Sequence, residues 1–512
     1  MPPSPIDPTL PRYPTVVHAL VEAARRAPGR TALIFEGREL TYAQYLRAVA
    51  GFARRLGRHG VAGGRVAVMT ANSIEAAVAM LGVMAARAQM VPFNPFFTVS
   101  ELRPQLADSQ PSVLVCDAGS ADKARALAGD LPVEVLTPDD IARWRDDATA
   151  TLPEPLPADD DWATLPYTGG TTGLPKGANH RHANITTFFT QVLTQWPLGF
   201  DDQRFLNVAP MFHIWGSQFA TWIPIYTRNT LVVLPKYEPD RVLDAIERHR
   251  ITVFAGGPPA IYIGLTSSPR FATTDFSSLR YCLSGGAPCP EQLLRGWEQK
   301  TGCVLLEGYG MSEGAPIANN PINGARKLLS VGLASPETEV EVVDVETGTR
   351  AMPTGERGEV RVRGRQFMQG YRNRPEETAQ TLRDGWLHTG DIGFLDEDGY
   401  LFLVDRKKDM VIVGGYNVYP RAVEEVLFKH PAIHEAAVVG APDDRLGEVL
   451  MAFVALRPDA TLGEEEFFAY CAENLVKYRR PVRVTFMPML PKTAANKIDK
   501  LALRARARAA ST

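Results

Sequence analysis

The stretch Y-T-G-G-T-T-G-L-P-K-G, from Tyr167 to Gly177, gathers glycines, hydroxyl side chains and one lysine into a single loop. Glycine lets a backbone approach an anion closely and point its N–H groups at it. Threonine hydroxyls add hydrogen-bond donors, and a lysine adds positive charge. The pattern predicts a polyphosphate-binding loop made by Thr168, Gly169, Gly170, Thr171, Thr172, Gly173 and Lys176.

This loop is not a Walker A motif. That motif, G-x-x-x-x-G-K-[ST], runs directly into a helix, whereas here Pro175 precedes the lysine and Gly177 follows it. The mechanics of P-loop NTPases are therefore not expected. On its own the stretch also fits an ordinary Gly/Thr-rich surface turn, so its interpretation depends on the rest of the chain.

Six further blocks follow in order: A-P-M-F-H (209–213), S-G-G-A-P (284–288), E-G-Y-G-M-S-E (307–313), W-L-H-T-G-D (386–391), D-R-K-K-D-M-V-I-V-G-G-Y-N-V-Y-P (405–420) and P-K-T-A-A-N-K-I-D-K (491–500). Together with the loop they resemble the adenylate-forming enzymes. That superfamily holds acyl- and aryl-CoA synthetases, adenylation domains of peptide synthetases and firefly-type luciferases. The resemblance runs from about Tyr13 to the C-terminus, and it is strongest to the fatty acyl-CoA synthetases.

The composition is that of a globular protein with more than one domain. A chain of 512 residues exceeds one typical core, and a formal net charge of −3 argues against a nucleic-acid partner. The longest apolar stretch, residues 76–86, is too short to span a bilayer, so we expect a buried helix there and at most peripheral membrane contact. Five scattered cysteines and the lack of a signal-like N-terminus predict a cytoplasmic protein with reduced thiols.

The order of the patterns predicts an α/β fold. A strand–helix–strand unit at 231–254 indicates parallel sheet, and alternation at 340–363 indicates a small antiparallel barrel or sheet. With the resemblance, we expect a large N-terminal domain, residues 1–405, of two α/β subdomains plus a small β-barrel-like subdomain. A small mobile α+β C-terminal domain, residues 406–512, is expected to follow a hinge near residue 408.

The resemblance implies which residues handle ATP. Glu313 takes the position of the Mg²⁺ ligand, with the Ser312 hydroxyl near the phosphates, and Mg²⁺ suits one carboxylate with phosphate oxygens and waters. Asp391 and Arg406 would hold the ribose hydroxyls. Gly285, Gly286 and Ala287 would leave a flat slot for adenine, with Tyr309 stacking on one face of the base. Glu307, Gly308 and Gly310 are expected to bind ATP as well.

The resemblance also implies a two-step reaction. A carboxylate is already ionised near neutral pH, so its attack on ATP needs in-line positioning and charge neutralisation rather than a base. Lys497 would bridge the carboxylate and the α-phosphate in that step. The C-terminal domain would then rotate about Lys408, and Gly414 and Gly415 would line a tunnel for the thiol of CoA.

The acyl pocket is expected to be apolar. His213 lies where relatives place an aromatic or histidine gate, although a core histidine is the alternative. Further lining residues are Trp215, Gly257, Pro258, Pro259 and Met311. Small and apolar side chains favour an apolar acyl chain or ring.

These expectations combine into an ATP-dependent acid–CoA ligase that uses Mg²⁺ and acts on a medium- or long-chain fatty acid. An aryl or alicyclic acid, and a carrier-protein phosphopantetheine as acceptor, stay open. So do oxygenation of an acyl-adenylate, a homologue that binds without turnover, and a homodimer.

Overall fold

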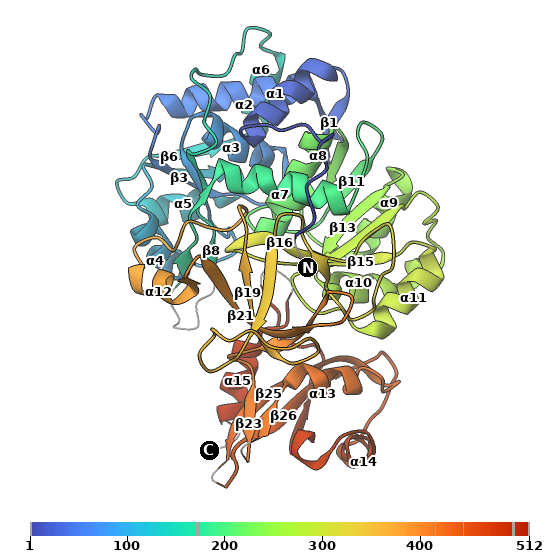
Figure 1. Ribbon diagram of the computed structural model, residues 1–512. Helices are drawn as coiled ribbons and strands as arrows, with labels where there is room; N and C mark the ends of the chain where they lie inside the picture. The colour runs from blue at the N-terminus through green and yellow to red at the C-terminus, as the bar shows by residue number, and fades with distance from the viewer. Residues whose placement is uncertain (1–2, 169–174, 415, 444, 494–496, 510–512) are drawn as a thin grey trace.

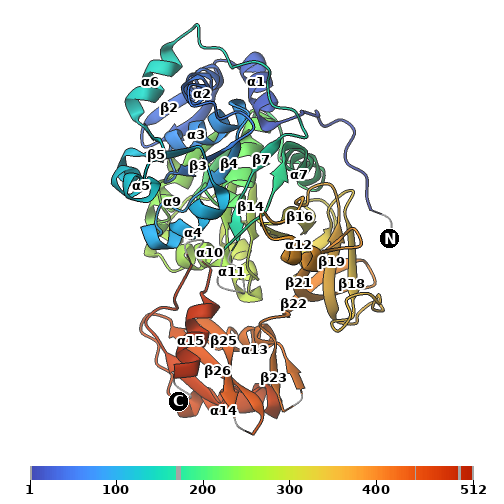
Figure 2. The ribbon, with the colours of Figure 1, turned by 90° about the vertical axis from the view of Figure 1, so that its left-hand side faces the viewer.

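The computed structural model describes residues 3–168, 175–414, 416–443, 445–493 and 497–509. A large N-terminal part lies above a small C-terminal domain in both views (Figures 1 and 2). Among the described residues, the large part contains two large sheets that carry helices and one two-stranded pair, and the small domain contains a further sheet. The predicted α/β fold with a large and a small domain is therefore confirmed.

The first sheet has six strands in the order β10-β7-β4-β3-β5-β6. All neighbours are parallel except β10 and β7. The strands are β3 (Arg65–Met69), β4 (Gln89–Pro92), β5 (Val113–Asp117), β6 (Val133–Leu136), β7 (Trp162–Thr164) and β10 (His180–Arg181). The helices of this region are α1 (Val16–Arg26), α2 (Tyr42–Gly57), α3 (Ile74–Ala85), α4 (Val99–Ser109), α5 (Ala121–Ala128), α6 (Pro138–Asp146) and α7 (His182–Gln195).

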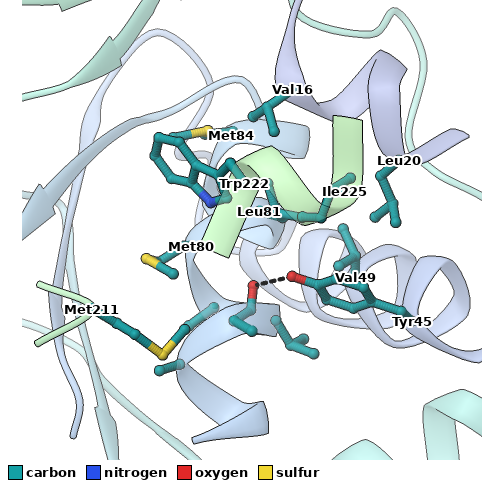
Figure 3. Packing of buried hydrophobic residues seen from close by; sticks show 14 of the residues in the cluster. Val16, Leu20, Tyr45, Val49, Met80, Leu81, Met84, Met211, Trp222 and Ile225 are labelled. Carbon is teal, nitrogen blue, oxygen red and sulfur yellow. Dashed lines mark hydrogen bonds between the residues drawn. The ribbon is translucent and has the colours of Figure 1, made fainter. Parts of the chain in front are cut away.

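The apolar stretch at 76–86 forms most of α3, and every residue of that helix is buried. Figure 3 shows Met80, Leu81 and Met84 of α3 packed with side chains of α1 and α2 and with Trp222. Tyr45 of α2 donates its hydroxyl to the Ala77 carbonyl at 3.0 Å. Burial of each large apolar side chain contributes about 1.5–3 kcal/mol to the free energy of folding. The helix is thus buried on all its faces, as predicted.

The second sheet joins two kinds of pairing, in the order β18-β19-β21-β22-β17-β16-β15-β14-β13-β11-β12-β1-β2. From β15 (Leu305–Met311) through β14 (Tyr281–Gly285), β13 (Val253–Gly257), β11 (Arg204–Asn207) and β12 (Thr230–Val233) to β1 (Thr31–Phe35) the neighbours are parallel. The edge strand β2 (Arg38–Thr41) is antiparallel. Helices α8 (Ile223–Thr227), α9 (Pro239–Arg248), α10 (Pro259–Thr266) and α11 (Glu291–Thr301) belong to this part.

Beyond β15 the same sheet turns antiparallel. It continues through β16 (Gly314–Asn319), β17 (Gly332–Ala334), β22 (Tyr400–Arg406), β21 (Trp386–Leu395), β19 (Gly358–Arg363) and β18 (Glu339–Val343). The short β20 (Leu382–Arg383) pairs with β21, and α12 (Pro375–Thr381) precedes it. The antiparallel subdomain predicted from 340–363 is thus hydrogen-bonded to the parallel part, which places residues of both at one site.

The C-terminal domain has its own sheet in the order β24-β23-β26-β25, with β27 parallel to β26. The strands are β23 (Val411–Val413), β24 (Tyr416–Val418), β25 (Ile433–Asp443), β26 (Gly447–Leu456) and β27 (Arg483–Phe486), and the helices are α13 (Pro420–Leu427), α14 (Glu464–Asn474) and α15 (Lys500–Ala509). The chain passes from β22 to β23 over residues 407–410. Among the described residues, no helix combines the length and apolarity needed to cross a membrane.

Candidate active site

The two arms of the phosphate loop form a short antiparallel pair, β8 (Tyr167–Thr168) and β9 (Lys176–Gly177). Thr168 lies opposite Lys176, and Tyr167 lies opposite Gly177. A Cβ on Gly177 would come within 2.9 Å of Leu165, so glycine allows this close pairing. Both arms of the loop are therefore fixed. Gly169, Gly170, Thr171, Thr172 and Gly173 lie outside the described residues.

Glu313 is buried at the turn between β15 and β16, with 7% of its surface exposed. Its Oε1 accepts the hydroxyl of Tyr371 at 2.6 Å, and no ion pair of its carboxylate occurs among the described residues. A buried carboxylate without a cation partner fits a divalent ion that also binds phosphate oxygens. No group of three or more His, Cys, Asp or Glu side chains suited to a metal occurs in the described part of the chain. A Mg²⁺ ion here would have Glu313 as its protein ligand.

Ser312, next to Glu313, is held through its backbone. Its carbonyl oxygen accepts a hydrogen bond from His180 Nε2 at 2.8 Å. Burial lowers the pKa of His180 to about 4, so this histidine is neutral and carries its proton on Nε2. Neither His180 nor Tyr371 was predicted from the sequence, because each meets its partner only through the tertiary structure.

Asp391 and Arg406 face each other across β21 and β22. Arg406 Nε donates to Asp391 Oδ1 at 2.9 Å, and the Tyr309 hydroxyl donates to Asp391 Oδ2. The neighbouring carboxylate raises the pKa of Arg406, so the guanidinium stays charged. Asp391 is 5% exposed, and these two hydrogen bonds hold its carboxylate in place. Its role in ribose binding stays a prediction. Stacking of Tyr309 on adenine stays a prediction.

The end of β14 approaches other backbone and side chains very closely. A Cβ on Gly285 would lie 2.7 Å from the Trp215 ring and 2.8 Å from the Gly308 carbonyl oxygen. Gly308 and Gly310 are similarly crowded: a Cβ would lie 2.7 Å from Asn319 Oδ1 and from Ala315 Cβ, respectively. These glycines and Ala287 keep the ends of β14 and β15 free of bulky side chains, as a slot for a flat base requires.

Glu307 is placed differently from the other predicted ATP-binding residues. Burial raises its pKa to about 7, while the charge of Arg421, in α13 of the C-terminal domain, opposes that rise. Its carboxylate therefore lies within the electrostatic reach of the other domain. A direct role in ATP binding stays a prediction for this residue.

Lys497 comes from the C-terminal domain and reaches the end of β14. A Cβ on Gly286, whose φ is +80°, would lie 3.1 Å from Lys497 Cε and 3.2 Å from its Nζ. The loop that carries the lysine is closed by Thr493, whose N–H donates to the Lys497 carbonyl at 2.7 Å. Burial lowers the pKa of Lys497 to about 8; the nearby Arg406 also lowers it, and Asp391 raises it. The structure thus brings the predicted lysine to Gly286, Asp391 and Arg406.

His213 lies within the electrostatic reach of that lysine. Burial lowers its pKa to about 3, and the charge of Lys497 adds to the effect, so the imidazole is neutral. The loop before it is held by Asn72, which accepts from the Met211 N–H at 2.8 Å and donates to the Ala209 carbonyl at 3.0 Å. A neutral histidine fits a lining or gating role at the acyl pocket rather than a charged one.

Trp215 begins the π-helix η2 (Trp215–Trp222) and lies against Gly257 of the predicted acyl pocket and Gly285 of the predicted adenine slot. Its ring lies 3.5 Å from a Cβ built on Gly257 and stacks on Phe219 with 4.9 Å between ring centroids. Its Nε1 donates to the Ala255 carbonyl at 3.1 Å. Pro258 follows β13, and Met311 ends β15. The pocket candidates His213, Trp215 and Gly257 therefore lie together beside Gly285.

The predicted hinge and thiol-tunnel residues lie apart from this cluster. Lys408 follows β22, and burial together with Arg406 lowers its pKa. Gly414 has a φ of +56° and donates its N–H to the Leu446 carbonyl at 2.9 Å, a contact within the C-terminal domain. Gly415 lies outside the described residues. The role of Gly414 in a thiol tunnel stays a prediction.

Comparison with known families identifies the chain. The family model described as AMP-binding enzyme matches residues 20–372, and the AMP-binding enzyme C-terminal domain matches residues 422–497. The chain belongs to the AMP-binding enzyme family. This confirms the resemblance to adenylate-forming enzymes that the sequence blocks indicated.

Relatives of known name match over nearly their whole length. A long-chain-fatty-acid–CoA ligase of Bacillus subtilis is 37% identical over 94% of this chain and 93% of its own. A feruloyl-CoA synthase of Amycolatopsis is 37% identical over 95% and 98%, respectively. The ATP-bound crystal structure of MatB from Rhodopseudomonas palustris is 32% identical, covers 96% of this chain and 98% of that one, and has a TM-score of 0.88. The AMP-binding family member described here is an AMP-forming acid–thiol ligase.

The same MatB protein in its apo form has a TM-score of 0.79 over the same shares of the two chains. The arrangement seen here is therefore more similar to the ATP-bound form. This agrees with the position of Lys497 beside Gly286, where it would face a nucleotide.

Proposed function

We propose that this acid–thiol ligase joins a carboxylic acid to CoA in two steps that share one site. The acid first attacks the α-phosphate of Mg²⁺·ATP, which gives acyl-AMP and pyrophosphate. The thiol of CoA then attacks the acyl carbon, which gives acyl-CoA and AMP. The observation that carries the proposal is the position of Lys497, delivered by one domain to the Asp391–Arg406 pair and Gly286 of the other.

In the first step the chain's own groups would act by position and charge. Asp391 would accept from the ribose hydroxyls, Thr168 and Lys176 would lie at the β- and γ-phosphates, and Glu313 would hold Mg²⁺, which neutralises phosphate charge when bound. Lys497, with a pKa of about 8, is mostly protonated at neutral pH. Its ammonium would stabilise the charge that develops between the carboxylate and the α-phosphate.

The second step needs access from the side that Lys497 now occupies. Because the end of the Lys497 side chain lies close to Gly286, we expect the thiol to need a different path while the domain is docked. We propose that the C-terminal domain turns about Lys408, withdraws the lysine and presents Gly414 and Gly415 to the thiol. Such rigid-body motions use a few residues between domains, as at 407–410 here.

For the acid we propose a medium- or long-chain fatty acid. The apolar lining and the relative named as a long-chain-fatty-acid–CoA ligase support this class. One observation favours an aryl acid instead: the Trp215 ring, stacked on Phe219, covers Gly257 and Gly285 and offers a flat surface. The relative named as a feruloyl-CoA synthase agrees with that second candidate.

All five cysteines are free and buried, which supports action in a reducing compartment, the cytoplasm. The test is pyrophosphate release with Mg²⁺·ATP across fatty, aromatic and alicyclic acids, with and without CoA, and with products weighed by mass spectrometry. Acyl-CoA with AMP is the expected result and names the acid. Acyl-AMP that CoA does not discharge would contradict the CoA step and favour a carrier protein or another acceptor. ATP binding without turnover of any acid would contradict the proposal.

A further inference from the structure

Residues 367–372, here called the bridging segment, run between β19 and α12 and contact two parts of the candidate site. The Met368 N–H donates to the Glu313 carbonyl at 2.7 Å. Further along, the Arg372 N–H donates to the Gly177 carbonyl at 2.8 Å, and Tyr371 forms a β-bridge with Ala178. The segment is thus hydrogen-bonded both to the turn that carries Glu313 and to the arm that leaves the phosphate loop.

The side chain of Tyr371 makes the same connection a second time. Its hydroxyl donates to Glu313 Oε1 at 2.6 Å. Its ring lies beneath Lys176, whose Nζ is 5.3 Å from the ring centroid. One half-buried tyrosine therefore touches both the carboxylate expected to hold Mg²⁺ and the lysine expected to hold phosphate.

The position of Tyr371 itself is fixed from behind. Its backbone N–H donates to Thr378 Oγ1 at 2.9 Å, and the Thr378 hydroxyl donates to the Arg374 carbonyl at 2.7 Å in α12. The preceding Gly370 has a φ of +131°, and a Cβ there would lie 2.8 Å from Thr378 Cγ2. The ring therefore has little freedom to move, and it can serve as a reference point for more flexible groups.

Glu313 and Lys176 both need such a reference. A carboxylate that accepts one hydrogen bond on Oε1 keeps Oε2 for a metal, and Mg²⁺ tolerates little deviation in ligand geometry. A lysine ammonium sits on a flexible four-carbon stem, and an aromatic face limits where it rests.

We propose that Tyr371 is a positioning residue that holds the Glu313 carboxylate and the Lys176 ammonium in a fixed relation, so that both meet the same Mg²⁺·ATP. This inference rests on the proposed function of the site. In this proposal the Tyr371 hydroxyl positions Glu313 and the Tyr371 ring positions Lys176. Two variants, one without the hydroxyl and one without the ring, can therefore measure the two contributions separately.

The experiment uses the full chain and Mn²⁺ as the probe, titrated by electron paramagnetic resonance in the presence of ATP and without acid. Y371F removes the hydroxyl and keeps the ring. It should weaken Mn²⁺ binding to the protein–ATP complex about 10-fold, while ATP affinity measured in EDTA stays unchanged. Y371L removes the ring as well and should also weaken ATP binding in EDTA, by about 3-fold.

Two controls keep the test specific. Y237F removes a tyrosine hydroxyl that donates to the Ile261 carbonyl at 2.7 Å, and it should leave Mn²⁺ binding unchanged. E313Q removes the carboxylate charge through which Tyr371 is proposed to act. Adding Y371F to E313Q should therefore produce no further loss of Mn²⁺ affinity.

Wild-type Mn²⁺ affinity in Y371F would overturn the inference, and so would an equal loss of ATP affinity in EDTA. A full Y371F effect in the E313Q background would also overturn it, because the tyrosine would then act on something other than Glu313. If the wild-type protein bound no Mn²⁺·ATP and released no pyrophosphate, the proposed function would fail and this inference with it. Pyrophosphate release by the wild type therefore tells the two failures apart.

Discussion

On the nucleotide side of the site, Asp391 is held by Arg406 and Tyr309, all within strands of one continuous sheet. Lys497 arrives instead from the C-terminal domain, where its carbonyl accepts the Thr493 N–H at 2.7 Å. The first group is preorganised, while the second depends on how the domains are docked. We therefore expect substitutions at Asp391 to weaken ATP binding and substitutions at Lys497 to slow acyl-AMP formation. Only the second of these steps needs Lys497 in place.

Replacing Lys497 should give the largest effect. K497A should slow acyl-AMP formation about 100- to 1,000-fold, because a charge that stabilises the transition state is lost. ATP binding, measured by equilibrium dialysis without acid, should stay near the wild-type value. Pyrophosphate release and product mass report the reaction. K477A, at a lysine exposed on the C-terminal domain, is the matched control. Undiminished pyrophosphate release from K497A would refute the assignment.

Asp391→Asn tests the preorganised side. The amide keeps the shape but loses the charge that pairs with Arg406, so ATP affinity should fall about 10-fold. In contrast to K497A, this loss should already be present when no acid is added. Dialysis with ATP alone measures it, and a melting curve checks the fold. If ATP affinity were unchanged while turnover fell, the division between the two sides would be wrong.

The pH dependence of acyl-AMP formation should report Lys497. Its pKa is lowered to about 8 by burial and Arg406, and the protonated form is the active one. The rate should therefore fall as the pH rises through about 8, by about 10-fold at pH 9. His213 is neutral throughout this range, because its pKa is about 3.

Substitution by arginine gives the control for that pH profile. Arginine stays protonated throughout, so any residual adenylation by K497R should lack the decline above pH 8. A K497R profile with the same alkaline decline would assign the ionisation to another group.

Trp215→Ala should give the smallest effect, and it tests which class of acid the pocket prefers. Removing the ring above Gly257 and Gly285 should raise the kcat/KM ratio of a long-chain fatty acid to an aromatic acid about 5-fold. Measuring both acids on one preparation cancels any loss of folded enzyme. A ratio shifted toward the aromatic acid would show that the ring does not form the flat surface proposed for it.

Much of this arrangement could be predicted from the chain itself. The alternation at 340–363 corresponds to two neighbouring antiparallel strands, β18 and β19. The family resemblance, rather than periodicity, indicated Asp391 and Arg406 as a pair, and they are cross-strand partners. Periodicity was sufficient for the strands themselves, because it reports which residues of a strand face the core.

The contacts of His180 and Tyr371 could not be predicted in this way. His180 reaches Ser312 across 132 positions, and Tyr371 reaches Glu313 across 58. The sequence of the bridging segment has neither helical nor strand periodicity, so its position cannot be predicted from local pattern. Its partners depend on how α12 and the arm of the phosphate loop pack against each other. The sequence also did not predict that the parallel and antiparallel strands form one continuous sheet through β15 and β16, because strand order depends on tertiary packing.

The close approach of Lys497 to Gly286 has a consequence for the separation of the two half-reactions. A Cβ at position 286 would lie 3.1 Å from Cε and 3.2 Å from Nζ of Lys497, at a φ of +80° that favours glycine. An alanine there would displace the end of the lysine side chain by a few tenths of an ångström without removing it. We expect such an enzyme to make acyl-AMP more slowly while it still accepts ready-made acyl-AMP for thioester synthesis.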